Sequence, residues 1–128
     1  MEPGEADSSP ARDSPASAEL RQIIQPVENI AQAVDFYSRA FGLHVRFVDD
    51  DRFAALDAGG AVLALAAGEE NLAGHSAPAF KVTDLDGFLA SFSAAGGTTL
   101  RGPEVGPHER RVVVADPWGN RIVVYASS

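Results

Sequence analysis

A pattern repeated at a spacing of 55 residues constrains the fold of this chain more than any other feature. Each copy has a residue that can cap a helix, apolar residues at helical spacing and a closing glycine. The matched positions are Val27, Asn29, Val34, Tyr37, Ala40 and Gly42 in the first copy, and Val82, Asp84, Leu89, Phe92, Ala95 and Gly97 in the second. Agreement of all three features favours a duplicated unit over chance similarity between two amphipathic helices.

Strand-like segments accompany both predicted helices in the same order. They lie at 20–27, 44–48, 52–57 and 61–67 in the first copy, and at 78–82, 98–101, 110–115 and 121–126 in the second. Residues 102–108 contain two prolines and are expected to form a loop. The pattern predicts an α+β domain over residues 19–128. Its two tandem βαβββ modules, at about 20–67 and 78–126, are joined by a linker at 68–77.

Composition restricts the surroundings and partners of this domain. Residues 1–18 are rich in Ser, Pro, Ala and acidic residues, so we expect a disordered tail. The chain has no cysteine and no long apolar run, and its start lacks the order of a signal peptide, which predicts a cytoplasmic protein with no membrane partner. A net charge of −8 disfavours nucleic acid. It either only keeps the protein soluble or also makes a neutral or cationic ligand better tolerated than a polyanion.

Three stretches of sequence carry a resemblance to a known family. They are centred on Val27-Glu28-Asn29, on Phe80-Lys81-Val82-Thr83-Asp84 and on the turn Asp116-Pro117-Trp118-Gly119-Asn120. Together they resemble the vicinal oxygen chelate superfamily, which includes glyoxalases, extradiol dioxygenases and bleomycin-resistance proteins. The resemblance implies that the two modules form a curled mixed sheet around a cavity.

The resemblance also implies four positions that hold a divalent metal in the enzymes of the family. Counted from the shared turns and caps, they fall at Gln22, Ala64, Ala77 and Val123. Three of these side chains are alkyl groups, and one neutral amide cannot hold a divalent ion against water. We therefore expect no metal and no other cofactor, as in the metal-free, antibiotic-binding branch of the family.

Strand alternation extends this prediction to the cavity wall. Residues at even offsets from the four positions share their face, which adds Ile24, Ala66, Ala79, Lys81 and Tyr125. The alanines among them predict a roomy, largely apolar cavity. The opposite parity is apolar, as packing under helices requires, except for Gln25, for which the pattern offers no reason.

Further candidate contacts come from resemblance to the bleomycin-resistance branch. Phe53 corresponds to a phenylalanine that stacks on flat drug rings, although ordinary sheet packing also explains it. His108 stands where that branch often has a stacking tryptophan, and a solvated loop histidine is the alternative. Trp118 either caps the cavity rim or covers the sheet edge. Arg110 is a candidate for ligand contact or for a solvated face.

These features predict a metal-independent protein that sequesters an aromatic or hydrophobic natural product. The alternative is a glyoxalase-like lyase, isomerase or dioxygenase with an atypical metal site, using groups such as His75, His108, Glu109 and Tyr125. A third possibility is an interaction module without a small ligand. The apolar edge strands of each module need covering, so we expect a homodimer with its cavities across or beside the interface.

Overall fold

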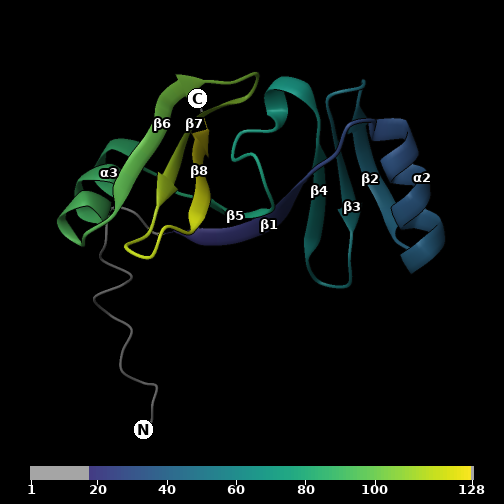
Figure 1. The fold of residues 1–128 in the computed structure, drawn as a ribbon, viewed down its shortest axis with the longest axis horizontal. Coiled ribbons are helices and arrows are strands. Elements are labelled where there is room, and N and C mark those ends of the chain that lie inside the picture. The colour runs from purple at the N-terminus through teal and green to yellow at the C-terminus, as the bar shows by residue number, and fades with distance from the viewer. Residues whose placement is uncertain (1–17, 128) are drawn as a thin grey trace, which may run out of the picture.

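The computed structural model describes residues 18–127. Apart from Ala18, the predicted disordered tail lies outside this range. The chain forms one eight-stranded sheet in the order β2-β3-β4-β1-β5-β8-β7-β6, with a helix on the outside of each half (Figure 1). The sheet is curled and unclosed, so the predicted α+β architecture of two βαβββ modules is confirmed.

The two modules have the same order of elements. Module one comprises β1 (Glu19–Pro26), α2 (Ile30–Phe41), β2 (His44–Asp49), β3 (Phe53–Asp57) and β4 (Val62–Ala66). Module two comprises β5 (Ala77–Lys81), α3 (Leu85–Ala94), β6 (Thr98–Val105), β7 (Glu109–Ala115) and β8 (Arg121–Ser127). The linker between them contains a single 3-10 turn, η1 (Gly68–Glu70).

The modules meet through their first strands. β1 pairs antiparallel with β5, with Ile24 opposite Ala77, while β4 and β8 pair parallel on either side. This register places the first strands of both modules at the centre of the sheet and leaves β2 and β6 as its edges. The concave face between the two halves therefore belongs to both modules.

Both helices begin at the predicted caps. The Asn29 side chain accepts a hydrogen bond from the Gln32 amide at 2.8 Å, and the Asp84 side chain accepts one from the Gly87 amide at 3.0 Å. The cap of α3 is Asp84, the residue 55 positions after Asn29. Gly42 ends α2 with a φ of 71°, a left-handed conformation that favours glycine.

The prediction of a short strand at 98–101 followed by a loop was wrong in its extent. β6 continues to Val105, with Glu104 paired to Arg111 and Val105 to Arg110. The register shifts between Arg101 and Glu104, so Pro103 lies in an irregularity of an edge strand. A missing backbone N–H is tolerated there, which is why the proline did not end the strand.

The sheet separates two kinds of core, as the alternation predicted. Apolar residues on the outer face of the strands pack under α2 and α3 in two separate clusters. The concave face carries Ile24, Ala64, Ala66, Ala77, Ala79 and Val123. Gln25 lies on the helix side because it donates to the Tyr37 hydroxyl of α2 at 3.2 Å and accepts from the Ser76 hydroxyl. Within residues 18–127, no helix is long and apolar enough to cross a membrane.

Candidate functional site

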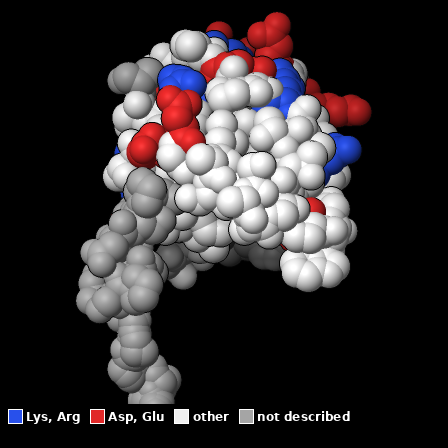
Figure 2. All heavy atoms as spheres, turned by 90° about the vertical axis from the view of Figure 1, so that its left-hand side faces the viewer, with Lys and Arg blue, Asp and Glu red and all other residues white. Residues whose placement is uncertain are grey.

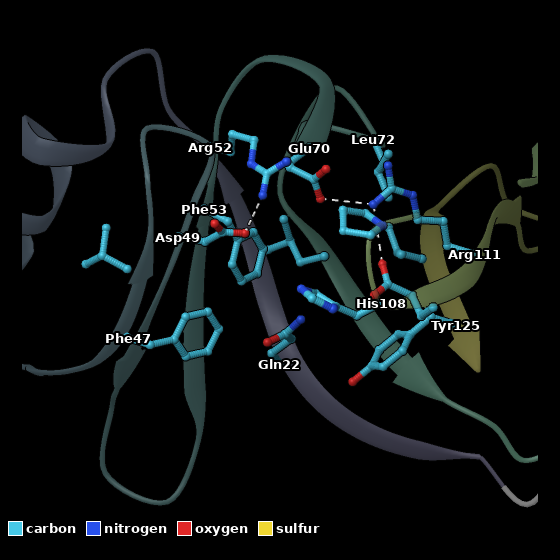
Figure 3. Close-up of a pocket in the computed structure, with 15 residues that line it drawn as sticks. Gln22, Phe47, Asp49, Arg52, Phe53, Glu70, Leu72, His108, Arg111 and Tyr125 are labelled. Carbon is cyan, nitrogen blue, oxygen red and sulfur yellow. Dashed lines mark hydrogen bonds and ion pairs between the residues drawn. The ribbon is translucent and has the colours of Figure 1, made fainter. Parts of the chain in front are cut away.

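A cavity of about 650 Å³ opens on the concave face of the sheet (Figure 3). Its floor includes Gln22 and Ile24 of β1 and Val123 of β8. The two modules provide its opposite walls, and the linker closes one end. The volume lies in the range of natural small-molecule sites, which suits a ligand of drug-like size.

The wall from module one is aromatic. Phe47 of β2 and Phe53 of β3 stack with their ring centroids 6.1 Å apart and an interplanar angle of 25°. Phe53 also packs against the concave core, whereas Phe47 remains 52% exposed. Both rings line the cavity, so a flat molecule can contact aromatic surface that is already partly desolvated.

The wall from module two is polar. The side chains of His108, in the loop before β7, and Tyr125 of β8 lie across the cavity from Phe53, with Gln22 between the walls (Figure 3). Burial raises the pKa of the Tyr125 phenol above its ordinary value of 10.0. The phenol therefore stays protonated at neutral pH, as a hydrogen-bond donor and acceptor.

The linker folds into the concavity and is held there by side chains of module two. Arg111 of β7 donates to the Glu70 carboxylate at 2.9 Å, and Arg121 of β8 donates to the Ala73 carbonyl at 2.7 Å. Leu72 and Ala73 consequently pack onto the concave core. The space above the alanines of β4 and β5 is thus filled by the linker rather than left open.

Both arginines of the cavity wall are already paired with carboxylates. Arg52 lies 2.7 Å from Asp49, while Arg111 lies 2.9 Å from Glu70 and 3.3 Å from Glu109. Three carboxylates and two guanidinium groups line the cavity, giving a formal charge of −1. Because both guanidinium groups are already paired with carboxylates, the wall has no unpaired positive charge for an anionic ligand.

Comparison with known proteins agrees with this architecture. The sequence model of the glyoxalase/bleomycin resistance protein/dioxygenase superfamily matches residues 19–124. The chain belongs to this superfamily. An uncharacterized protein from Mycolicibacterium smegmatis is 35% identical over 84% of this chain and 93% of its own length.

Solved structures share the superfamily fold at low sequence identity. A superfamily member from Vibrio splendidus has a TM-score of 0.65 at 16% identity, covering 85% of this chain and 100% of that one. Methylmalonyl-CoA epimerase from Mycobacterium tuberculosis has a TM-score of 0.65 at 18% identity, covering 91% of each chain. These similarities support the fold alone.

The four positions that the family resemblance assigns to a metal do not provide a ligand set here. Gln22 is half-buried in the cavity floor, Ala64 and Ala77 lie beneath the linker, and Val123 presents an alkyl group. Across residues 18–127, no group of three or more His, Cys, Asp or Glu side chains could hold a metal ion. The residues present do not fit the metal centre that the superfamily implies.

The structure brings together only part of the predicted ligand-binding set. Of the predicted residues, five line the cavity: Gln22, Phe53, His108, Val123 and Tyr125. Ala64 and Ala77 share its face but are covered, because Leu72 and Ala73 pack on the same cluster. The prediction that the cavity is widest next to these alanines is therefore wrong, because the open volume lies toward Phe53 and Tyr125.

Three predicted contacts lie outside the cavity lining. Arg110 reaches the other face of the sheet, 3.6 Å from Asp86 of α3. Trp118 is 83% exposed in the turn between β7 and β8, so it does not cap the cavity rim. Lys81 ends β5 opposite Glu19 and does not line the cavity. Strand parity alone could not reveal how far each side chain lies from the open volume.

Sequence reasoning missed several residues of the wall, most clearly Phe47, Glu70, Leu72 and Arg111. Phe47 could have been found from its place opposite Ala55 and diagonal to Phe53 in a predicted hairpin. The linker residues carry no strand or helix pattern. Their inward path depends on the Arg111 and Arg121 contacts, which no local signal reveals.

Proposed function

We propose that this protein binds and sequesters a flat aromatic or hydrophobic natural product without using a metal ion. The observation that carries the proposal is the arrangement across the cavity, with the stacked Phe47 and Phe53 rings facing the polar groups of His108, Gln22 and Tyr125. Aromatic stacking supplies affinity, and the few polar groups orient the ligand. The absence of a donor cluster from the described residues supports a function that needs no Lewis acid.

The charge of the cavity narrows the ligand class. With both arginines paired and a formal charge of −1, the site favours neutral or cationic molecules over carboxylates and phosphates. The net charge of −8 acts in the same direction at longer range. A thioester of coenzyme A, with its phosphates, is therefore an unsuitable ligand for this wall.

Thermal unfolding with a panel of flat aromatic compounds, matched in size as cations, neutral molecules and anions, tests the proposal. A ligand present at a hundred times its dissociation constant should raise the free energy of unfolding by about 2.7 kcal/mol. The gain should persist in a chelator and appear for cations or neutral compounds. A panel without any shift, or a shift that needs a divalent metal, would contradict the proposal.

Variants of Phe53 separate stacking from simple packing. Phe53→Leu retains apolar volume but removes the ring, so affinity for a flat ligand should fall about tenfold, measured by calorimetry. Phe36→Leu is the matched control, because Phe36 is 57% exposed on α2 and does not line the cavity. Equal affinity in both variants would show that Phe53 has only a packing role.

An enzyme with an atypical metal site is the second candidate, supported by the presence of His108, Glu109 and Tyr125 in one cavity. Within residues 18–127, no hydrogen bond joins any two of these side chains, or any of them to His75, which bonds to Ser76. Elemental analysis of the purified protein distinguishes the candidates. Stoichiometric bound metal would favour the enzyme and overturn metal-independent binding.

A further inference from the structure

Four alanines of β4 and β5 form a floor on the concave face, and each is at most 1% exposed. We call this group the alanine floor: Ala64, Ala66, Ala77 and Ala79. Ile24 of β1 lies between Ala64 and Ala77 in the strand register, so the floor is one continuous apolar surface. Because methyl groups fill little space, the volume above them is taken by Leu72 and Ala73 of the linker.

The covering segment has a glycine at each end and hydrogen bonds of its own. We call residues 68–74 the strap. Gly68 and Gly74 have φ values of 57° and 84°, which glycine adopts without strain. Within the strap, the Asn71 amide donates to the Gly68 carbonyl and the Gly74 amide donates to the Asn71 side chain, both at 3.1 Å. The strap can therefore keep its shape while it turns about its two ends.

Two arginine side chains of module two hold the strap in the concavity. Arg111 donates to the Glu70 carboxylate, and Arg121 donates to the Ala73 carbonyl. The strap forms no strand pair, because β4 ends at Ala66 before it begins. Outward movement of the strap thus requires two side-chain contacts to break and leaves every strand in place.

Arg111 has other partners when Glu70 leaves. Its Nη1 donates both to Glu70 at 2.9 Å and to Glu109 at 3.3 Å. Its Nε is buried and, within the described part of the chain, has no hydrogen-bond partner, although Glu104 lies 3.9 Å away. An unused buried donor destabilises this closed arrangement. Release of the strap would leave Arg111 with Glu109 and free it to bond Glu104.

The balance of charge around Arg111 also favours release. Arg101 donates to Glu104 through Nε at 3.2 Å and through Nη2 at 3.1 Å. Figure 2 faces this side of the molecule and shows acidic and basic groups close together in its upper part. With the strap closed, the carboxylates of Glu70, Glu104 and Glu109 share two guanidinium groups. Departure of Glu70 into water leaves two charges of each sign, so it costs less than breaking an isolated buried pair.

We propose that the alanine floor is a second compartment of the binding site, which opens when the strap is released from Arg111 and takes an apolar arm of the ligand. The inference rests on the proposed function, because the arm extends from the flat ring that lies beside Phe53. Leu72 both lines the cavity and packs on the floor, so its withdrawal joins the two spaces. An arm of about four carbon atoms would replace the apolar contacts of the leucine side chain.

Thiol labelling of the full chain tests whether the floor opens, because the sequence has no cysteine of its own. Ala64→Cys places a thiol on the floor, and Ala77→Cys provides a second reporter there. Ala54→Cys is the matched control, because Ala54 is equally buried, at 0% exposure, but lies under α2. Under native conditions Ala64→Cys should react at least roughly 100-fold faster than Ala54→Cys, since a local opening costs less than unfolding. Equal rates for the floor reporters and the control would overturn the proposal.

A charge removed from the strap tests the role of Arg111. Glu70→Gln weakens the contact with Arg111, so it should raise the labelling rate of Ala64→Cys roughly tenfold and leave that of Ala54→Cys unchanged. Glu69→Gln is the matched control, because Glu69 is an exposed neighbour on the same strap. Equal rates in the two glutamine variants would contradict release of the strap through Arg111.

Quinoline and butylquinoline are flat, neutral probes that differ only in an apolar arm. By calorimetry, the arm should raise affinity for the wild-type protein at least roughly tenfold. At equal occupancy, only butylquinoline should protect Ala64→Cys from labelling. Quinoline lacks the arm, so its binding tests the proposed function by itself. A butyl arm that leaves the labelling of Ala64→Cys unchanged would overturn the second compartment, while bound quinoline would still support the proposed function.

Discussion

Module one presents the stacked rings of Phe47 and Phe53 to the cavity, whereas module two presents His108, Glu109, Arg111 and Tyr125. The two modules nevertheless share their order of strands and the capping of their helices. The two modules thus share the path of their backbone but differ in the side chains that they present to the cavity. The result is a cavity with stacked rings beside the Asp49–Arg52 ion pair on one side and hydrogen-bonding side chains on the other.

The two modules also differ in how far the ion pairs of their cavity arginines are buried. Arg52 and Asp49 of module one have side chains 47% and 38% exposed, whereas Arg111 and Glu70 are 9% and 16% exposed. A surface ion pair contributes little to stability, but removing one member of a buried pair strands the other charge. Four comparisons test how far the modules differ, in decreasing order of expected effect.

Loss of the Arg111 guanidinium should have the largest effect. Arg111→Met leaves the carboxylates of Glu70 and Glu109 without their partner and releases the linker, so the free energy of unfolding should fall by about 3 to 5 kcal/mol. Arg52→Met in module one should cost less than about 1 kcal/mol. Urea unfolding measures both, and equal losses would mean that burial does not separate the two pairs.

The equivalent positions 22 and 77 should differ next. Ala77 is 1% exposed beneath the linker, so Ala77→Leu overpacks the concave core and should cost about 1 to 3 kcal/mol. Gln22→Leu faces the open cavity and should change stability by less than about 1 kcal/mol. Thermal unfolding of the two variants provides the comparison. A tolerated leucine at position 77 would show that the linker does not fill that space.

Helix caps should behave alike in both modules. Asn29→Ala and Asp84→Ala each remove one side-chain acceptor at a helix start, so each should cost about 1 kcal/mol in urea unfolding. Asn29→Asp keeps an acceptor and should retain most of the stability. A cost confined to one module would break the symmetry that the duplicated caps suggest.

The smallest predicted difference concerns the turns before the last strands. In module two, hydrogen bonds from the Asn120 side chain and backbone, opposed by some desolvation and helped by the Trp118 and Gly119 amides, lower the pKa of Asp116 below 3.8. Because the pKa of Asp116 is lower in the folded than in the unfolded protein, its carboxylate stabilises the fold at pH values above the unfolded pKa. That contribution is lost as the pH falls through the folded pKa. An NMR titration should show the low pKa, and Asn120→Ala should raise it toward 3.8.

Module one needs no such carboxylate, because Gly59 and Gly60 adopt φ values of 66° and 88° in its turn. A normal pKa for Asp116 in the wild-type protein would contradict the prediction.

The sequence predicted the scaffold well because its determinants are local. Caps at Asn29 and Asp84, the glycine after α2 and strand alternation each act over a few residues. Alternation even assigned the alanines of β4 and β5 to the concave face. By contrast, the extent of β6 depended on pairing with Arg110 and Arg111, which overrode the local signal of Pro103.

The site was only partly predictable, because cavity lining depends on depth as well as face. Gln22, Phe53 and Tyr125 were placed correctly on the wall, but Lys81 lies beyond the open volume on a predicted strand. The linker was the largest omission. Its course is fixed by contacts of Glu70 with Arg111 and of Ala73 with Arg121. These partners are 41 and 48 positions apart in the sequence, so no local stretch of sequence predicts the contacts.

The inward linker has a consequence for how binding could change over evolution. Leu72 and Ala73 take up space on the concave face, and Glu70 and Leu72 line the cavity, so residues 68–76 limit the cavity together with the strands. An insertion or deletion in this segment could admit a different guest without disturbing a single strand pair. Conversely, imidazole or carboxylate groups placed at positions 64 and 77 would meet a filled space, so a metal centre built there would require the linker to move away first.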